Sequence, residues 1–514
     1  MNAAAQSGYR LAAALVAVLV LVACAANPVT KRQELSFVSE ADEIGIGARQ
    51  YQPAQQSSGG RYLLDPALSA YVADVGRKLV RVSDRPQLPF EFVILNDSVP
   101  NAWALPGGKL AVNRGLLTEL KSEAELAAVL GHEIVHAAAR HGARTVEQGT
   151  LLSAGAAIVS VLGSDSRYAG LIDFAAQGGA ALIGLRYGRE HELEADHYGI
   201  DYMVRAGYDP QAAVELQETF VRLSGNKSAN WLAGLFATHP PSQERVDANR
   251  ARAAGMPAKL FRGEDVYRQK IAHLIGAKPA YQAHDEGRKL LAKEPQKALD
   301  KADEAIALEP REGLFHALRG DALKKLGRGA EAEKAYDEAV RLNGDYFAHY
   351  LGRGQVRQSL GNRAGARADF EQANRLLPTA NAHYALGSLA LGGNDTARAI
   401  EHFRLASASD SEVGRQAGAA LVRLDLPRNP AAYVRAEPGV DGNGVFVVRV
   451  ANRSAVALRN IRIAASVPAS GYYREFAVPG LRAGQTTAIL TGFRISATGA
   501  KGLQAQVRGA EVDE

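Results

Sequence analysis

The sequence predicts a multidomain chain that joins a mainly helical domain with a small β-sheet, an α-solenoid of helical repeats and a small β-sandwich. Three observations support this fold class. The 514 residues are too many for one core at about 150 residues per domain. A 34-residue spacing begins near residue 279, and β-branched runs separated by glycine and asparagine turns follow residue 430. The predicted segments are 1–23, 24–60, 61–265, 279–425 and 430–512.

Composition and charge exclude two classes of protein. With 47% apolar and 22% charged residues, the chain has the composition of globular domains rather than of disordered protein. Its net charge is +5, and no basic stripe with interleaved aromatic residues is present. We therefore expect no nucleic-acid partner.

The first 23 residues are predicted to be a lipoprotein signal peptide. Arg10 precedes an apolar run of 12 residues, Leu11 to Val22, which is too short to span a bilayer. The run ends in Leu21-Val22-Ala23-Cys24, which resembles the bacterial lipobox and implies lipidation of Cys24, the only cysteine. An ordinary signal peptide with a chance cysteine is the alternative. The resemblance implies a lipid-anchored periplasmic protein, and Ala25 after the cysteine favours the outer membrane.

Residues 24–60 are predicted to be a polar tether, after which the first compact domain begins at residue 61. Leu64 to Val82 is a predicted amphipathic helix, because its apolar residues recur on one face. Phe90 to Leu95 is a predicted strand. Pro106-Gly107-Gly108 is a turn signal between two extended segments, 101–105 and 109–112.

A long helix is predicted to follow, with Ser122 as its N-cap and Glu125 completing a capping box. Beyond it, Leu151 to Leu185 is rich in alanine, glycine and leucine and is interrupted by a polar stretch at 163–167. We expect a buried or membrane-surface helical hairpin there. A pair of membrane-spanning helices is the less favoured alternative, because neither apolar piece reaches the roughly 18–20 residues required.

The predicted long helix carries His132-Glu133-Ile134-Val135-His136, an HExxH motif. Residues i and i+4 lie one turn apart on one helix face, so both imidazoles can reach one metal ion. Glu133 lies about 100° around the helix from His132, close to the metal site, where a general base belongs. The alternative is a buried histidine pair that only packs a core helix.

Two histidines leave a catalytic zinc site one protein ligand short. Ala139 and Gly142 occupy the later positions of the longer HExxHxxGxxH motif, which excludes that class. Arg140 and His141 are predicted to be packing or surface residues, because His141 would point away on a continued helix. The third ligand is therefore expected to be a carboxylate from another helix, and the densest acidic helix nearby is 189–196.

At Glu192-Leu193-Glu194-Ala195-Asp196 the chain resembles the membrane-associated and periplasmic gluzincins that include the HtpX, CAAX prenyl and BepA-type proteases, whose second motif is ExxAD. The resemblance implies a gluzincin-type metalloprotease domain at 61–265 with one Zn²⁺ per chain. It assigns Glu192 to the metal and Asp196 to a hydrogen bond that orients a ligating imidazole. The resemblance to this family also covers segments 101–108, 114–117 and 204–210.

Peptide hydrolysis is the implied reaction, with Glu133 as the catalytic base that takes a proton from water and passes it to the leaving amine. An open sheet edge at Ala102, Trp103 and Ala104 is expected to hold substrate by main-chain hydrogen bonds. The group that stabilises the oxyanion is left open, and its candidates are Tyr187, Arg189 and Arg245.

Residues 236–242, Phe-Ala-Thr-His-Pro-Pro-Ser, are predicted to form a loop, because the paired prolines cannot continue a helix. The segment resembles the THPP segment of the BepA-type proteases. This resemblance implies that His239 can take the open zinc position as a fourth, inhibitory ligand. The alternative is that His239 packs against the domain or binds substrate.

Residues 279–425 are predicted to form tetratricopeptide-like repeats. Ala298, Ala332 and Ala366 are 34 residues apart, and Gly320 and Gly354 share this spacing. A 34-residue period with small residues and one aromatic resembles the tetratricopeptide helix pair. A generic alanine-rich bundle, the alternative, would not keep this register. The β-branched runs of 430–512 predict a small antiparallel sandwich with nothing catalytic in it.

Together these features predict a zinc-dependent endopeptidase of the bacterial envelope. The expected substrates are unfolded, misassembled or stalled outer-membrane and periplasmic proteins recruited by the repeats. Contact with the outer-membrane assembly machinery through the repeats is a further expectation. The alternative is a repeat-based scaffold or chaperone for outer-membrane protein assembly with little proteolysis. A cell-wall or lipid hydrolase with the same metal site is a third class.

Overall fold

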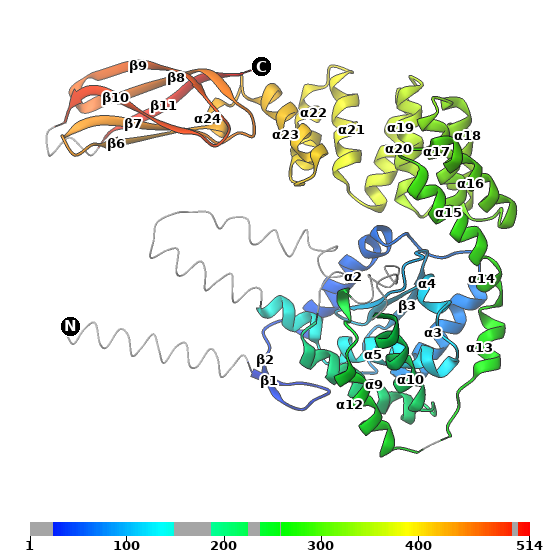
Figure 1. Cartoon of the computed structure of the whole chain (residues 1–514). Coiled ribbons are helices and arrows are strands. Elements are labelled where there is room, and N and C mark those ends of the chain that lie inside the picture. The colour runs from blue at the N-terminus through cyan, green and yellow to red at the C-terminus, as the bar shows by residue number, and fades with distance from the viewer. Residues whose placement is uncertain (1–23, 149–186, 225–236, 258, 496–501, 514) are drawn as a thin grey trace, which may run out of the picture. The chain divides into compact units, whose positions relative to one another are not determined.

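The computed structural model of the chain (Figure 1) describes residues 24–148, 187–224, 237–257, 259–495 and 502–513. The chain divides into two compact units, Met1–His349 and Tyr350–Glu514. Two predicted features, the signal peptide at 1–23 and the apolar hairpin at 151–185, lie outside the described residues. Within the described ranges, no helix combines the length and apolar character needed to cross a membrane.

The segment predicted to be a tether is folded against the helical domain, so that prediction is wrong. Strand β1 (Cys24–Ala26) pairs antiparallel with β2 (Gln33–Leu35), and α2 is an 18-residue helix over Glu40–Ser57. The amide of Asn27, just after β1, donates a hydrogen bond to the carbonyl oxygen of Ala139 at 2.9 Å. The N-terminal strands are therefore held at the end of the helix that carries the HExxH motif.

The polar composition of α2 conceals a buried face. Glu43 is fully buried and forms an ion pair with Arg85 at 3.1 Å. At Gly47 a Cβ atom would lie 1.9 Å from the carbonyl oxygen of Pro106, so only glycine lets α2 approach this turn. The amino-acid composition shows that these residues are polar, but it does not show that distant residues pair with them in the folded chain. The tether prediction is wrong for this reason.

A helical domain with one small sheet follows. The sheet has the strand order β3-β5-β4, with β3 parallel and β4 antiparallel to β5. Gly107 and Gly108 have φ values of 74° and 83° in the turn between β4 and β5, a conformation that glycine adopts without strain. The elements are α3 (Pro66–Val80), β3 (Glu91–Leu95), β4 (Ala102–Leu105), β5 (Lys109–Asn113), α4 (Arg114–Leu117), α5 (Glu123–Ala138), α9 (Arg189–Arg205), α10 (Gln211–Ser224) and α12 (Gln243–Ala254).

Helix α5 is buried along its whole length, which explains why its sequence is apolar on nearly every face. Ser122 caps it, because the serine hydroxyl accepts a hydrogen bond from the Glu125 backbone N–H at 3.1 Å. The other half of the predicted capping box is not formed. The Glu125 carboxylate accepts from the backbone N–H of Lys121 at 2.6 Å instead of from that of Ser122.

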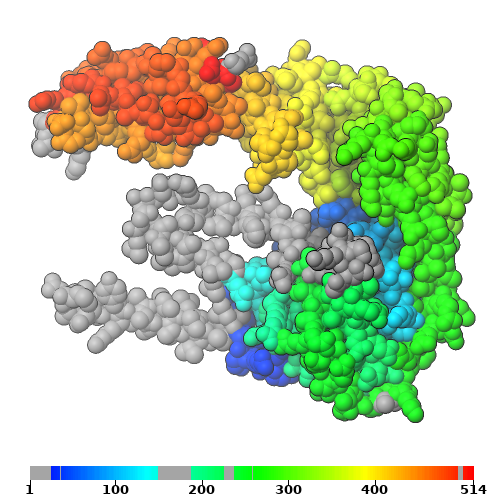
Figure 2. All heavy atoms as spheres, in the orientation of Figure 1, coloured from blue at the N-terminus to red at the C-terminus, as the bar shows by residue number. Residues whose placement is uncertain are grey.

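The first repeats share a core with the helical domain in the same compact unit. One cluster of buried apolar side chains runs from Leu68 through α5 to Tyr281 and Phe315. The Asn96 amide donates to Glu312 at 2.9 Å. The Gln56 amide of α2 donates to the Asp345 carbonyl oxygen at 2.6 Å, and Figure 2 shows blue residues of this region directly against green ones.

Packing inside each repeat explains the 34-residue period. A Cβ atom on Gly320 would lie 2.7 Å from the Tyr336 ring, and one on Gly354 would lie 2.7 Å from the Phe370 ring. A small residue on the first helix of each pair thus receives the aromatic ring of the second. The helices are α13 (Glu264–Lys270), α14 (Ala272–Gly276), α15 (Lys278–Leu290), α16 (Pro295–Leu308), α17 (Gly313–Lys325), α18 (Gly329–Leu342), α19 (Phe347–Ser359), α20 (Arg363–Leu376), α21 (Ala380–Leu391), α22 (Thr396–Ser407) and α23 (Glu412–Asp425).

The C-terminal strands form two three-stranded antiparallel sheets, with orders β10-β7-β6 and β11-β8-β9. Alternate residues of β7 and β8 fill the space between them, among them Phe446, Val448, Ile461 and Ile463, which are fully buried. The predicted multidomain fold class is confirmed. The elements are α24 (Pro430–Tyr433), β6 (Val434–Val440), β7 (Val445–Asn452), β8 (Leu458–Val467), β9 (Tyr472–Leu481), β10 (Thr486–Arg494) and β11 (Gln504–Val512).

Candidate metal centre

A close crossing of α5 and α9 builds the centre. A Cβ atom on Gly131 would lie 3.1 Å from the carbonyl oxygen of Gly199, and one on Gly199 would lie 3.1 Å from the backbone nitrogen of His132. With glycine at both positions, the two backbones approach closely. This approach brings the acidic motif of α9 up to the HExxH motif of α5.

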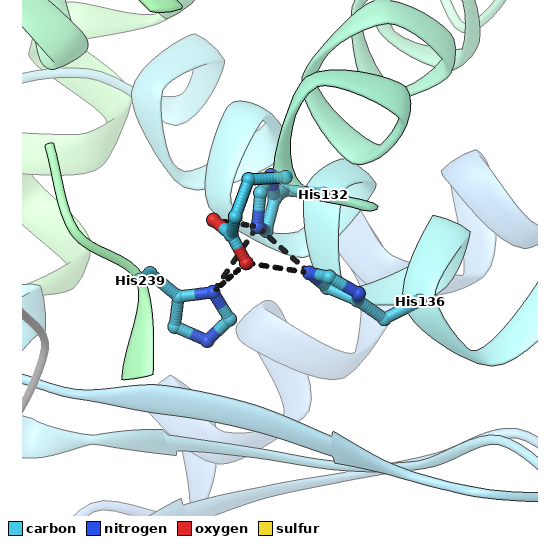
Figure 3. Close-up of side chains that lie close together, drawn as sticks. His132, His136 and His239 are labelled. Atoms are coloured by element: carbon cyan, nitrogen blue, oxygen red, sulfur yellow. Dashed lines mark hydrogen bonds and ion pairs between the residues drawn. The ribbon is translucent and has the colours of Figure 1, made fainter. Parts of the chain in front are cut away.

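Four side chains converge at this crossing, and three of them are the imidazoles labelled in Figure 3. His132 and His136 lie one turn apart on α5, with their Nε2 atoms 3.0 Å from each other. Glu192 of α9 places its carboxylate 3.5 Å from each of these nitrogens. His239, from the segment before α12, places Nδ1 3.0 Å from Glu192. One ligand atom from each residue lies within 4.8 Å of the other three, so this cluster is able to hold a metal ion.

Asp196 orients the first imidazole. Its carboxylate lies 2.8 Å from His132 Nδ1, which leaves Nε2 facing the cluster. Arg245 of α12 donates two hydrogen bonds to the same carboxylate, at 2.7 and 2.8 Å. Burial alone would raise the pKa of Asp196, but the charge and hydrogen bonds of Arg245 outweigh it and lower that pKa. Asp196 is thus an anionic acceptor that fixes the ring of His132.

Glu133 lies beside the cluster rather than in it. Its Oε1 is 3.5 Å from His239 Nε2, and its Oε2 has no hydrogen-bond partner among the described residues. Burial raises the pKa of Glu133, because the charged carboxylate loses its hydration. A raised pKa makes this carboxylate a stronger base, as proton abstraction from water requires.

His141 is a residue of the centre that the sequence analysis misplaced. It is fully buried, and its Nδ1 lies 2.7 Å from Nδ1 of His136. On its other side, His141 Nε2 lies 3.3 Å from the carboxylate of Glu194. The prediction assumed a continuous helix, but α5 ends at Ala138 and Arg140 has a φ of 61°, which turns the chain back. Glu194 of α9 is part of the same chain of contacts.

The three candidates for stabilising the oxyanion differ in position. Tyr187 is buried and stacks on His136, with ring centroids 4.0 Å apart. Arg245 is buried, and its Nη1 lies 2.9 Å from Glu192 Oε2. The two atoms form an ion pair but no hydrogen bond, and Glu192 Oε2 has no other hydrogen-bond donor among the described residues. Arg189 is exposed and pairs with Glu244, so it lies away from the centre.

The predicted substrate edge lies at the rim of the sheet but is not open. Strand β4 is an edge strand, yet Ala102, Trp103 and Ala104 are at most 6% exposed. The segment that carries His239 lies close to it, since the Thr238 hydroxyl donates to the Asn101 side-chain oxygen at 3.4 Å. Ala102 and His239 also line one pocket. The expectation of an open edge is therefore wrong for this conformation.

Comparison with known proteins agrees with these motifs. Residues 66–253 match peptidase family M48, and residues 315–346 match the tetratricopeptide repeat. The putative beta-barrel assembly-enhancing protease of Vibrio cholerae is 32% identical over 201 residues, which cover 38% of this chain and 40% of that protein. The mitochondrial metalloendopeptidase OMA1 of Schizosaccharomyces pombe is 33% identical over 225 residues, or 43% of this chain and 63% of that protein.

Among solved structures, the TPR domain of Arabidopsis OM64 covers 23% of this chain and 98% of its own length, at 26% identity and a TM-score of 0.22. The chain spans less than two thirds of the length of the two relatives from Vibrio cholerae and Schizosaccharomyces pombe, 40% and 63% respectively. The HExxH and ExxAD motifs both fall inside the matched range 66–253. The predicted resemblance is confirmed for two parts of the chain: residues 66–253 carry a peptidase family M48 domain, and residues 315–346 carry a tetratricopeptide repeat.

Proposed function

We propose that this chain is a zinc-dependent endopeptidase of the bacterial envelope that degrades misfolded or stalled outer-membrane and periplasmic proteins. The observation that carries the proposal is the buried cluster of His132, His136 and Glu192 with the buried carboxylate of Glu133 beside it, whose Oε2 has no hydrogen-bond partner among the described residues. Metallopeptidases need three protein ligands and an adjacent base, and these four residues supply them.

The spacing of the ligand atoms fits zinc. Four atoms at tetrahedral positions about 2.0–2.1 Å from a zinc ion lie about 3.3 Å from one another. His132 Nε2 lies 3.0 Å from His136 Nε2 and 3.3 Å from His239 Nδ1, and the Glu192 carboxylate lies 3.0 to 3.5 Å from each of these three nitrogens. One ligand atom from each of the four residues lies within 4.8 Å of the other three. Imidazole nitrogen and carboxylate oxygen are both ordinary zinc ligands, so we assign one Zn²⁺ per chain to this site.

Each residue of the centre has a role in the proposed hydrolysis. A bound zinc ion polarises the scissile carbonyl and lowers the pKa of water to about 7. Glu133 takes the proton from the attacking water and delivers it to the leaving amine. Asp196 and Arg245 keep His132 in the orientation that presents Nε2 to the metal. Tyr187 and Arg245 remain the candidates near enough to stabilise the oxyanion.

His239 is assigned the role of an inhibitory fourth ligand. Its Nδ1 lies 3.3 Å from His132 Nε2 and 3.0 Å from Glu192, which supports assigning it to the position that a catalytic zinc site keeps free. Its Nε2 faces Glu133 at 3.5 Å, where it stands between the base and the ligands. Opening the site therefore requires the segment around His239 to move.

Recruitment and location complete the proposal. The repeats are assigned the binding of unfolded or misassembled envelope proteins and of the outer-membrane assembly machinery. The name of one relative, a beta-barrel assembly-enhancing protease, supports this assignment. Lipidation of Cys24 would anchor the protein to the outer membrane on its periplasmic side.

The second candidate is a repeat-based scaffold or chaperone for outer-membrane protein assembly with little proteolysis. One observation favours it: in this conformation His239 fills the fourth ligand position and the edge strand β4 is buried. A centre closed in this way would show low basal activity whichever candidate is correct. The experiment therefore needs a variant in which the inhibitory ligand is removed.

Cleavage of casein and of an unfolded porin by the purified protein tests the proposal, with zinc content measured on the same samples. Glu133→Gln should retain zinc and lose about 10²–10⁴-fold in rate, both alone and combined with His239→Ala. Glu192→Ala should lose the metal. Glu190→Gln, an exposed glutamate on the same helix, is the matched control and should behave like wild type. Turnover by Glu133→Gln combined with His239→Ala near that of His239→Ala alone would refute the mechanism.

A further inference from the structure

A pocket opens directly beside His132 and Glu133, between α5, α9 and α10. Apart from the metal ligands, Glu133 and the ion pair of Asp196 with Arg245, its wall is apolar except at Gln217 and Asn249. The residues that form this inner wall include Val129, Gly199, Met203, Leu216, Gln217 and Phe220.

Helix α10 supplies the wall opposite the centre. Ala213 lies three and four residues before Leu216 and Gln217, and Phe220 lies four and three residues after them, so the four residues share one helix face. Leu216 and Phe220 are 5% and 8% exposed, as expected for an apolar face. Gln217 interrupts this face, although it is only 7% exposed. A glutamine at the centre of an apolar, buried face needs a physical reason.

The side-chain oxygen of Gln217 is buried and accepts no hydrogen bond from any described residue. A buried acceptor without a donor destabilises the folded protein, whereas a leucine in the same place would carry no such cost. The cost is recovered when a ligand brings a donor to this oxygen. The inner wall carries no charge, so the ligand group that enters it is apolar apart from that donor.

We propose that this pocket receives the substrate side chain next to the scissile bond and that it selects tyrosine. This inference rests on the proposed peptidase function, because the pocket shares His132 and Glu133 with the metal centre. The aromatic ring packs against Val129, Met203 and Phe220, and the phenolic O–H donates to the Gln217 side-chain oxygen. Phenylalanine fills the same space but leaves that oxygen unpartnered. A lysine side chain would bury a charge without a counter-ion.

Competition between peptides tests the selectivity. Peptides of one sequence that carry Tyr, Phe or Lys beside the scissile bond are cleaved together by the full chain with His239→Ala, and mass spectrometry reports the bond and the ratio of kcat/KM. We expect Tyr to exceed Phe about three- to tenfold, the worth of one net hydrogen bond. Lys should fall below both.

Gln217→Leu should reverse the order, so that the Phe peptide is cleaved faster than the Tyr peptide. Gln211→Leu is the matched control, since it makes the same change at an exposed position of the same helix and should keep the Tyr preference. A second readout does not need turnover. Fluorescence anisotropy of the uncut peptides with the zinc-loaded double variant Glu133→Gln, His239→Ala should give the same Tyr to Phe ratio of affinities, and this ratio should be lost when Gln217→Leu is added.

The outcomes separate this inference from the proposed function. Cleavage that depends on Glu133 but does not distinguish Tyr from Phe, or a Tyr preference that survives Gln217→Leu, overturns only the inference. Failure of every peptide and protein substrate to be cleaved, with zinc bound and His239 removed, overturns the proposed function and the inference with it.

Discussion

Replacing His141 with phenylalanine should weaken zinc binding although His141 is not a ligand. When His136 offers Nε2 to a metal, its proton must sit on Nδ1. The acceptor for that proton is His141 Nδ1, at 2.7 Å. Phenylalanine keeps the ring volume at this fully buried position but removes the acceptor. In the metal-free protein, His136 escapes the cost by taking the other tautomer, so the cost falls on the metal-bound state.

The magnitude follows from the geometry. A buried donor without an acceptor costs about 1–3 kcal/mol, which corresponds to a loss of about 5- to 150-fold in affinity at 1.4 kcal/mol per decade. This range contains the loss of roughly 10- to 100-fold that is usual when a partner of a ligating histidine is removed. His141→Asn supplies a carbonyl oxygen in place of Nδ1, so it should retain most of the affinity.

Competition with a fluorescent zinc chelator measures the dissociation constant of wild type and of both variants, and circular dichroism confirms that each is folded. The reasoning is refuted if His141→Phe binds zinc within twofold of wild type. It is also refuted if His141→Asn binds as weakly as His141→Phe, because the lost acceptor would then not be the cause.

Three further predictions concern other parts of the chain. His239→Ala should retain zinc and raise basal casein cleavage; a fall in activity at constant zinc content would instead make His239 a substrate-binding residue. Cys24→Ser should release the protein from membranes in fractionation, and a variant that still sediments with outer membranes after a salt wash would contradict lipid anchoring. Burial lowers the pKa of His349 from 6.5 to about 3. Between pH 6.5 and pH 3 the histidine is protonated in the unfolded chain but not in the folded chain, so the free energy of unfolding falls as the pH drops below 6.5. The free energy of unfolding, measured with urea, should lose about 2 kcal/mol between pH 8 and pH 5, and His349→Gln should abolish that part of the loss.

The parts of the centre that depend on one helix were predictable from the sequence. His132, Glu133 and His136 need only the helical repeat of 3.6 residues to fall on adjacent faces, and α5 provides it. Glu192 was identified through a motif, and the close crossing of α5 and α9 brings it to the histidines. The repeats were predictable for a similar reason, since each glycine that accommodates an aromatic ring recurs at a fixed interval.

The parts that depend on where the chain turns were not predictable. His141 was placed on the wrong side because the turn at Arg140 leaves no clear mark in the sequence. Arg245 was considered only for the oxyanion, since its pairing with Asp196 is a contact between residues 49 positions apart. Helix α2 was missed because its buried polar residues find partners such as Arg85, far along the chain.

The continuous core of the first compact unit has a consequence for engineering this chain. The segment matched to peptidase family M48 ends at residue 253, but Tyr267, Tyr281 and Phe315 belong to the same buried cluster as α5. Cutting at residue 253 would strip apolar cover from the catalytic helices, at about 25 cal/mol for each Å² exposed. Residues 24–57 would be lost as well if only the matched range were kept. The piece that can be exchanged between relatives is thus larger than the piece that they share in sequence, and it ends among the repeats, near residue 349.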